Sequence, residues 1–131
     1  MISFNYKYFL RVLNVFHTQC NDDEIFTKLI TFEDLEGARI SVDSNGKVTD
    51  QFVFHFQLLQ NEMLISSFRK NYNTTKKINR VCFGLTEKGQ MICRALFEKG
   101  GEDFLNSLGS HITYPVLLNA CSTIDDDIRL L

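Results

Sequence analysis

The sequence predicts an α+β fold, a winged helix-turn-helix with an inserted β-hairpin and additional C-terminal helices. Three successive segments support this prediction. The apolar run over residues 52–65 reads as a helix that stops before a strand, and a basic, apolar-poor stretch follows from Arg69 to Arg80. Residues 81–89 then join a short β-prone piece to a helix start. Helix, strand, polar loop, strand and helix, in this order, point to a binding module and not to a catalyst.

The composition is that of a single globular domain. The chain has 131 residues, of which 44% are hydrophobic and 23% charged, values that argue against disorder and allow a sizeable core. Twelve phenylalanines and a single proline favour a compact, aromatic-rich core. The net charge of −2 is not the basic balance of a dedicated DNA-binding protein, so any nucleic-acid site must be a local patch.

Signals for export, membrane insertion and metal binding are missing from the sequence. The N-terminus lacks a charged segment followed by an apolar one, and no run reaches roughly 18 apolar residues. We therefore expect neither a signal peptide nor a membrane span. The four cysteines are widely spaced without a Cys-x-x-Cys pair, which predicts mostly buried thiols in the reducing cytoplasm of a host cell, with no metal and no cofactor.

Two helices are predicted in the first third of the chain. Apolar residues recur at spacings of three and four over residues 5–19, which predicts the first helix. Asn21 then offers an N-cap, and Glu24 three residues on comes close to a capping box. The second, short helix is expected to fade near Thr31. Its inward residues are Ile25, Phe26, Leu29 and Ile30.

Residues 37–49 predict a small hairpin between the second and third helices. The segment from Ala38 to Val42 alternates apolar and polar residues, and Asp43 to Gly46 marks a turn. The Asn-Gly pair within that turn suits type I′ geometry.

The third helix is predicted from Thr49 or Asp50 to about residue 62. Phe52, Phe56, Leu59 and Met63 fall on one helical stripe, although alternating apolar residues at 52, 54, 56 and 58 leave a strand open. The good helix formers over residues 57–63 favour the helix.

The remaining elements follow from shorter signals. Leu64–Phe68 and Val81–Phe83 are predicted as two wing strands, with residues 69–80 as the wing tip. Thr86 caps a helix that ends at Gly100-Gly101. Further elements are expected as follows: an amphipathic turn with Phe104, Leu105 and Leu108 stopped by Gly109, a last helix from Thr113 and Pro115, and a frayed tail containing Asp125–Asp127.

Part of this pattern resembles a known group of proteins. His55 followed by Leu58-Leu59 and Leu64-Ile65, and then Leu85-Thr86 with Gly89, is similar to small winged-helix proteins of phages and prophages, the YjcQ-like proteins and a related family of unknown function. Their pattern runs roughly His-x-x-Leu-Leu-x-x-x-Gly-Leu-Ile, then Leu-Thr-x-x-Gly-x-x-Phe-Leu. The resemblance covers residues 50–97. Met63 stands where those proteins usually have Gly, and Ile92-Cys93 where they often have Phe-Leu.

The basic stretch is the best candidate for a binding site. Five of the chain's 14 basic residues lie within twelve positions, and no acid interrupts them. They are Arg69, Lys70, Lys76, Lys77 and Arg80, and Tyr72 and its polar neighbours add hydrogen-bonding groups. A wing with this composition can contact DNA phosphates in a salt-sensitive way. The alternative interpretation is a solvated loop.

The predicted third helix is a second candidate. Gln57, Gln60 and Asn61 can read base edges, since Gln and Asn suit adenine. The helix has no Lys or Arg, however, and Asp50 and Glu62 would be repelled by phosphates. An ordinary exposed polar face is the alternative.

No motif predicts catalysis. We expect His55 to make a structural hydrogen bond, and no Cys-His nucleophile pair, phosphate-binding Gly loop or pair of catalytic carboxylates stands out.

Two functions from different classes stay open. One is a non-enzymatic, DNA-binding transcription regulator of a phage or mobile element, a homodimer as many winged helices are. It would contact double-stranded DNA with the wing on phosphate and the helix at residues 50–62 in the major groove. The other is a protein-binding inhibitor of a host factor, of the anti-defence or anti-CRISPR type. The basic wing favours the first function, and the acidic total charge favours the second.

Overall fold

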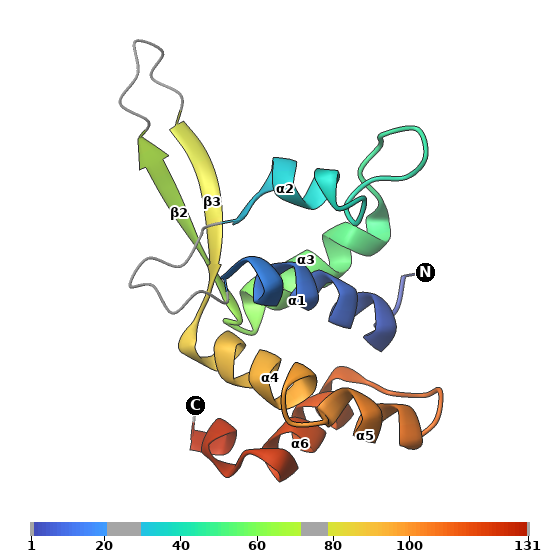
Figure 1. Cartoon of the computed structure of the whole chain (residues 1–131). Coiled ribbons are helices and arrows are strands. Elements are labelled where there is room, and N and C mark those ends of the chain that lie inside the picture. Colours follow the sequence, from blue (N-terminus) through green and yellow to red (C-terminus); the bar gives the residue numbers. More distant parts are fainter. Residues whose placement is uncertain (1, 21–29, 72–78, 131) are drawn as a thin grey trace.

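The computed structural model describes residues 2–20, 30–71 and 79–130. These residues form helices and a small antiparallel sheet, which confirms the predicted α+β class (Figure 1). In chain order the elements are α1 (Tyr6–Cys20), β1 (Ile30–Thr31), α2 (Phe32–Gly37), α3 (Asp50–Asn61), β2 (Ile65–Asn71), β3 (Asn79–Leu85), α4 (Glu87–Phe97), α5 (Gly101–Ser107), α6 (Tyr114–Ile124) and the 3₁₀ helix η1 (Asp126–Leu130). None of the described helices is long and apolar enough to cross a membrane.

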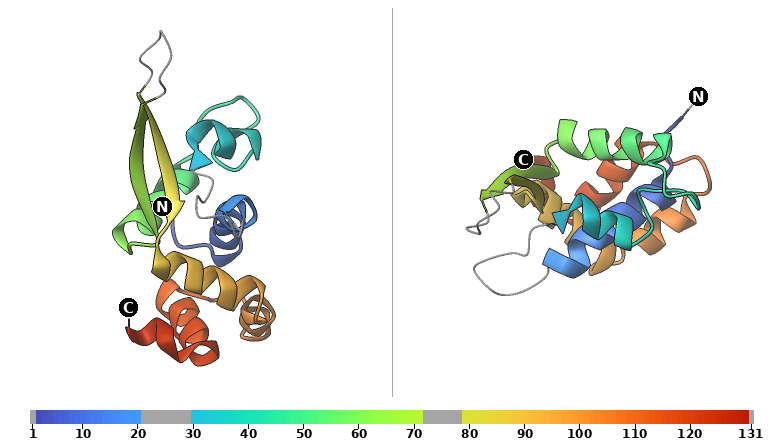
Figure 2. Two further views of the ribbon diagram at one scale, coloured as in Figure 1. Left: turned by 60° about the vertical axis from the view of Figure 1, so that its left-hand side comes forward. Right: turned by 90° about the horizontal axis from the view of Figure 1, so that it is seen from above.

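The sheet has the strand order β1–β3–β2 and is antiparallel throughout. β2 and β3 pair from Ile65 opposite Leu85 to Asn71 opposite Asn79, and form a ribbon that stands clear of the helices at its far end (Figures 1 and 2). Residues 69–71 and 79–80 were predicted as wing tip but belong to the strands, because the ladder of backbone hydrogen bonds continues into the basic stretch.

The core lies on both sides of α1. Phe9, Leu13 and Phe16 have no exposed surface, and α1 lies between the half that contains the sheet, α2 and α3 and the half formed by α4, α5 and α6 (Figure 1). On the sheet side, the ring of Phe56 stacks on Phe52 and meets Phe83 edge-on with a centroid distance of 4.8 Å. The phenylalanines therefore build much of the core, as their number predicts.

The prediction of the second helix is wrong for its last two residues, Ile30 and Thr31. Ile30 and Thr31 form β1, where Ile30 pairs with Phe83, and the helix that follows was not predicted. Thr31 caps it through a capping box with Asp34, in which each side chain accepts a backbone N–H from the other residue. The predicted cap at Asn21 and the inward residues 25–29 lie outside the described residues.

The predicted hairpin between α2 and α3 is reduced to a single bridge, Val42 opposite Val48. Its turn is not type I′, because that type needs positive φ at both central residues. Gly46 has a φ of 77°, but Asn45 is not among the described residues with positive φ. The Gly46 N–H donates to the Asp43 carbonyl, and the Asp43 carboxylate accepts from Asn45 and Lys47. Asp43 therefore stabilises the turn through both its carbonyl and its carboxylate.

The segment after Thr49 is the predicted helix and not a strand. Thr49 accepts from the Phe52 N–H as its N-cap, and α3 ends in a Schellman motif. In this motif the Met63 N–H donates to Gln60 and the Leu64 N–H donates to Leu59.

A close packing contact joins α4 to the start of β2. A Cβ built at Gly89 would overlap the carbonyl oxygen of Leu64, so only glycine fits there. Thr86 caps α4 as predicted and also donates a hydrogen bond to the Met63 carbonyl.

The C-terminal part corrects two predictions. α4 ends at Phe97, and Gly100, with a φ of 83°, is the N-cap of α5 and not the end of α4. The predicted frayed tail is packed, because Ile128 is buried in the core and Lys99 donates to the Asp125 carboxylate. α6 is capped by Thr113 and starts with Pro115 in its first turn, as predicted.

Candidate functional site

α3 separates its side chains into two faces. Phe52, His55, Phe56 and Leu59 are buried. The predicted site residues Gln57, Gln60 and Asn61 are exposed, together with Val53 one turn earlier. The structure therefore brings these three polar residues onto one outward surface, and adds an apolar side chain to it.

A groove of about 370 Å³ lies between α2, the segment 41–48 and this outward side of α3. Three large apolar side chains are exposed there, Phe32 to 49%, Val48 to 60% and Val53 to 41%. Its other lining residues are Glu36, Ser41, Val42, Phe52, Phe56, Gln57 and Gln60. We call this the α2–α3 groove.

The walls of the α2–α3 groove are fixed by contacts with the core. The Phe32 ring lies 5.5 Å from Phe56 and 4.9 Å from Phe83, centroid to centroid. The segment 41–48 is tied down at its start and its end, since Tyr8 Oη donates to the Ile40 carbonyl at 2.6 Å and the Thr49 N–H donates to Ser41. The groove is thus preformed, as binding pockets usually are.

One wall of the groove is acidic. α2 carries Glu33, Asp34 and Glu36 and no basic residue. Glu36 lines the groove itself and is exposed. A phosphate backbone would be repelled here, whereas a cationic surface would be attracted.

The basic candidates lie at the far end of the β2–β3 ribbon. Lys70 pairs with Arg80, and Arg69 pairs with Val81. Lys70 is five residues beyond Ile65, which places it about 17 Å from the start of the ribbon at ~3.3 Å per residue. The basic end is therefore a separate surface from the outward face of α3. Tyr72, Lys76 and Lys77 lie outside the described residues.

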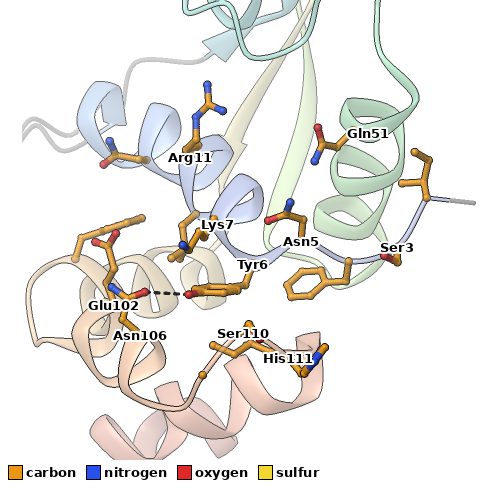
Figure 3. Close-up of a pocket in the computed structure, with 17 residues that line it drawn as sticks. Ser3, Asn5, Tyr6, Lys7, Arg11, Gln51, Glu102, Asn106, Ser110 and His111 are labelled. Carbon is orange, nitrogen blue, oxygen red and sulfur yellow. Dashed lines mark hydrogen bonds between the residues drawn. The ribbon is translucent and has the colours of Figure 1, made fainter.

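A larger, open hollow of about 1250 Å³ lies between the N-terminal segment, α1 and the α5–α6 connection (Figure 3). Its polar groups do not converge on one point. Tyr6 Oη donates to Asn106 Oδ1 at 3.0 Å near the middle, while Arg11 and His111 lie toward opposite ends (Figure 3). This arrangement joins α1 to α5 and offers no focused ligand site.

The buried titratable groups are structural. Both nitrogens of His55 are hydrogen-bonded, Nε2 accepting from the Asn5 N–H at 3.0 Å and Nδ1 donating to the Gln51 carbonyl at 2.7 Å. Burial lowers the pKa of His55, which favours this neutral form. The two hydrogen bonds confirm the structural role predicted for His55. Burial also raises the pKa of Cys121 to about 12, which leaves it without the thiolate that a nucleophile needs. In the described ranges no three His, Cys, Asp or Glu side chains gather as metal ligands.

Comparison with protein-family models, curated proteins and solved structures gave no match.

The sequence reasoning missed the apolar part of the α3 surface. One signal was present, since Val53 and Phe54 are apolar but lie off the stripe of Phe52, Phe56 and Leu59. Phe32 and Val48 come from other segments, and only the fold brings them beside Val53.

Proposed function

We propose that this chain is a non-enzymatic winged-helix protein of phage or mobile-element type that binds double-stranded DNA through the β2–β3 ribbon. The element order α1–β1–α2–α3–β2–β3 and the strand order β1–β3–β2 support the winged-helix assignment, with the ribbon as the wing.

The observation that carries the proposal is the register of the ribbon. It places Lys70 opposite Arg80, with Arg69 next to them, at the end of a projecting two-stranded element. The sequence between them adds Lys76 and Lys77 and contains no acid. Such a concentration of cations on a narrow projection matches the phosphate contacts that dominate nonspecific DNA affinity.

The exposed face of α3 does not support base reading by Arg or Lys, because the helix has neither. Asp50 and Glu62 at its two ends oppose a phosphate backbone. The proposed binding is therefore led by phosphate contacts of the ribbon and depends strongly on salt.

A salt titration with a fluorescent random duplex tests this function. Five phosphate contacts predict a slope of about −4.5 in a plot of log affinity against log salt. Arg69→Ala/Lys70→Ala/Arg80→Ala should lower the affinity at low salt and reduce the slope by about 2 to 3.

The matched control is Lys7→Ala/Lys47→Ala/Arg94→Ala, which removes the same charge from exposed positions outside the ribbon. It should keep most of the affinity. No binding by the unmodified chain at low salt, or equal losses in the two triple variants, would contradict the proposal.

A further inference from the structure

We infer that the α2–α3 groove is a docking site for a basic amphipathic helix of a partner protein, which would insert an apolar side chain into it. This surface is independent of the ribbon, and it is the kind of surface that the alternative function, inhibition of a host protein, would need.

Exposed apolar side chains cluster around the α2–α3 groove. Phe32, Val48 and Val53 come from three separate elements, and each leaves more than a third of its surface in water. Single exposed apolar residues are ordinary on protein surfaces, but several around one concave site mark an interaction site.

The α2–α3 groove is small, and its walls are already in place. Its volume of about 370 Å³ lies at the low end of ligand pockets, which suits one or two apolar side chains. One wall, the segment 41–48, is held in place without a partner, because the Ile40 and Ser41 carbonyls accept hydrogen bonds from Tyr8 and Thr49. Docking therefore requires little rearrangement, which lowers its entropic cost.

The negative charge beside the groove selects the occupant. Glu36 lines the groove, and α2, which forms one of its walls, carries three acids and no base. The complementary partner carries Lys or Arg beside its apolar anchor. Gln57 and Gln60 line the α3 side and can hydrogen-bond to polar groups of that partner. A helix laid into a groove presents such alternating anchors at spacings of three and four residues.

The test uses the full chain and fluorescein-labelled helical peptides in a polarisation titration. The probe is a peptide with one leucine face and one lysine face. Two control peptides replace its lysines with glutamate or its leucines with glutamine. We expect the leucine-lysine peptide to bind and both control peptides to bind at least tenfold more weakly.

Variants then locate the site. Val48→Ser/Val53→Ser keeps the charge and should weaken peptide binding about tenfold, because two partly exposed contacts are lost. Glu36→Gln should weaken it less and make it less sensitive to salt. The control is Val116→Ser on α6, a valine 39% exposed against 41% for Val53, which should leave the affinity unchanged. The double variant should also keep its affinity for duplex DNA.

Four outcomes would overturn the inference, and three of them concern peptide binding. The leucine-lysine peptide fails to bind, or the glutamate peptide binds as tightly, or Val48→Ser/Val53→Ser binds the peptide like the unmodified chain. Sedimentation that shows a concentration-dependent dimer lost in the same double variant would also overturn it, because a second copy of the chain would then be the occupant.

Discussion

Met63 takes a left-handed backbone conformation, with a φ of 59°, at the position just after the C-cap of α3. Glycine is favoured there because it has no Cβ to clash. The Met63 side chain is 70% exposed and adds little packing.

Met63→Gly should therefore stabilise the fold. Removing the left-handed strain outweighs the extra entropy of glycine in the unfolded chain, so we expect a gain of about 0.5 kcal/mol. Urea unfolding measures it. Met63→Ala is the control, since it removes the side chain but keeps the Cβ; an equal gain in both variants would assign the effect to the side chain.

His55 predicts a pH dependence of stability. Its pKa in the folded chain is lowered by burial, so between that value and about 6.5 the unfolded chain binds a proton that the folded chain does not. This contribution is fully present above pH ~6.5 and is lost as the pH falls. The slope cannot exceed about 1.4 kcal/mol per pH unit, the limit for a difference of one bound proton.

Urea unfolding between neutral and mildly acidic pH tests this prediction. His55→Gln should be less stable at neutral pH but should lose less stability on acidification, whereas exposed His111→Gln should behave like the unmodified chain. Parallel curves for all three proteins would show that another group controls the effect.

At the scale of elements, the contact between α4 and the start of β2 fixes the root of the ribbon. Gly89→Ala would place a methyl group on the Leu64 carbonyl, which is backbone and cannot swing aside as a side chain can. We expect a loss of about 3 kcal/mol in the free energy of unfolding, from overpacking against backbone.

Gly37→Ala provides the matched control for this prediction. Gly37 is also helical, but a Cβ there would meet nothing within 4 Å, so the change should be neutral or slightly stabilising. Similar effects of the two substitutions in urea unfolding would contradict the packing argument.

Elements with local signals could be predicted from the sequence. Thr49, Thr86 and Thr113 each cap a helix, and each signal lies within a few residues of the helix that it starts. Ile30 shows the limit of this reasoning. Its helical spacing to earlier apolar residues is overridden by pairing with Phe83, far along the chain, which makes it part of a strand.

At the scale of the whole molecule, the candidate surfaces were predictable to different degrees. The basic stretch is contiguous in sequence, so the cluster at Lys70 and Arg80 could be named without a structure. The α2–α3 groove could not, because Phe32, Val48 and Val53 meet only after the helices have packed. The two surfaces differ in charge, which is why we propose an anionic partner for the one and a cationic partner for the other.

The hydrogen bond between Tyr6 and Asn106 joins residues that are 100 positions apart in the sequence. The fold around α1 can therefore be completed only after the later residues have been synthesised. α1 leaves the ribosome before α4, the helix against which it packs. Until α4 has been synthesised, Phe9, Leu13 and Phe16 have no complete core to enter. During that interval the nascent chain carries an uncovered apolar helix, which chaperones can bind and through which neighbouring chains can aggregate.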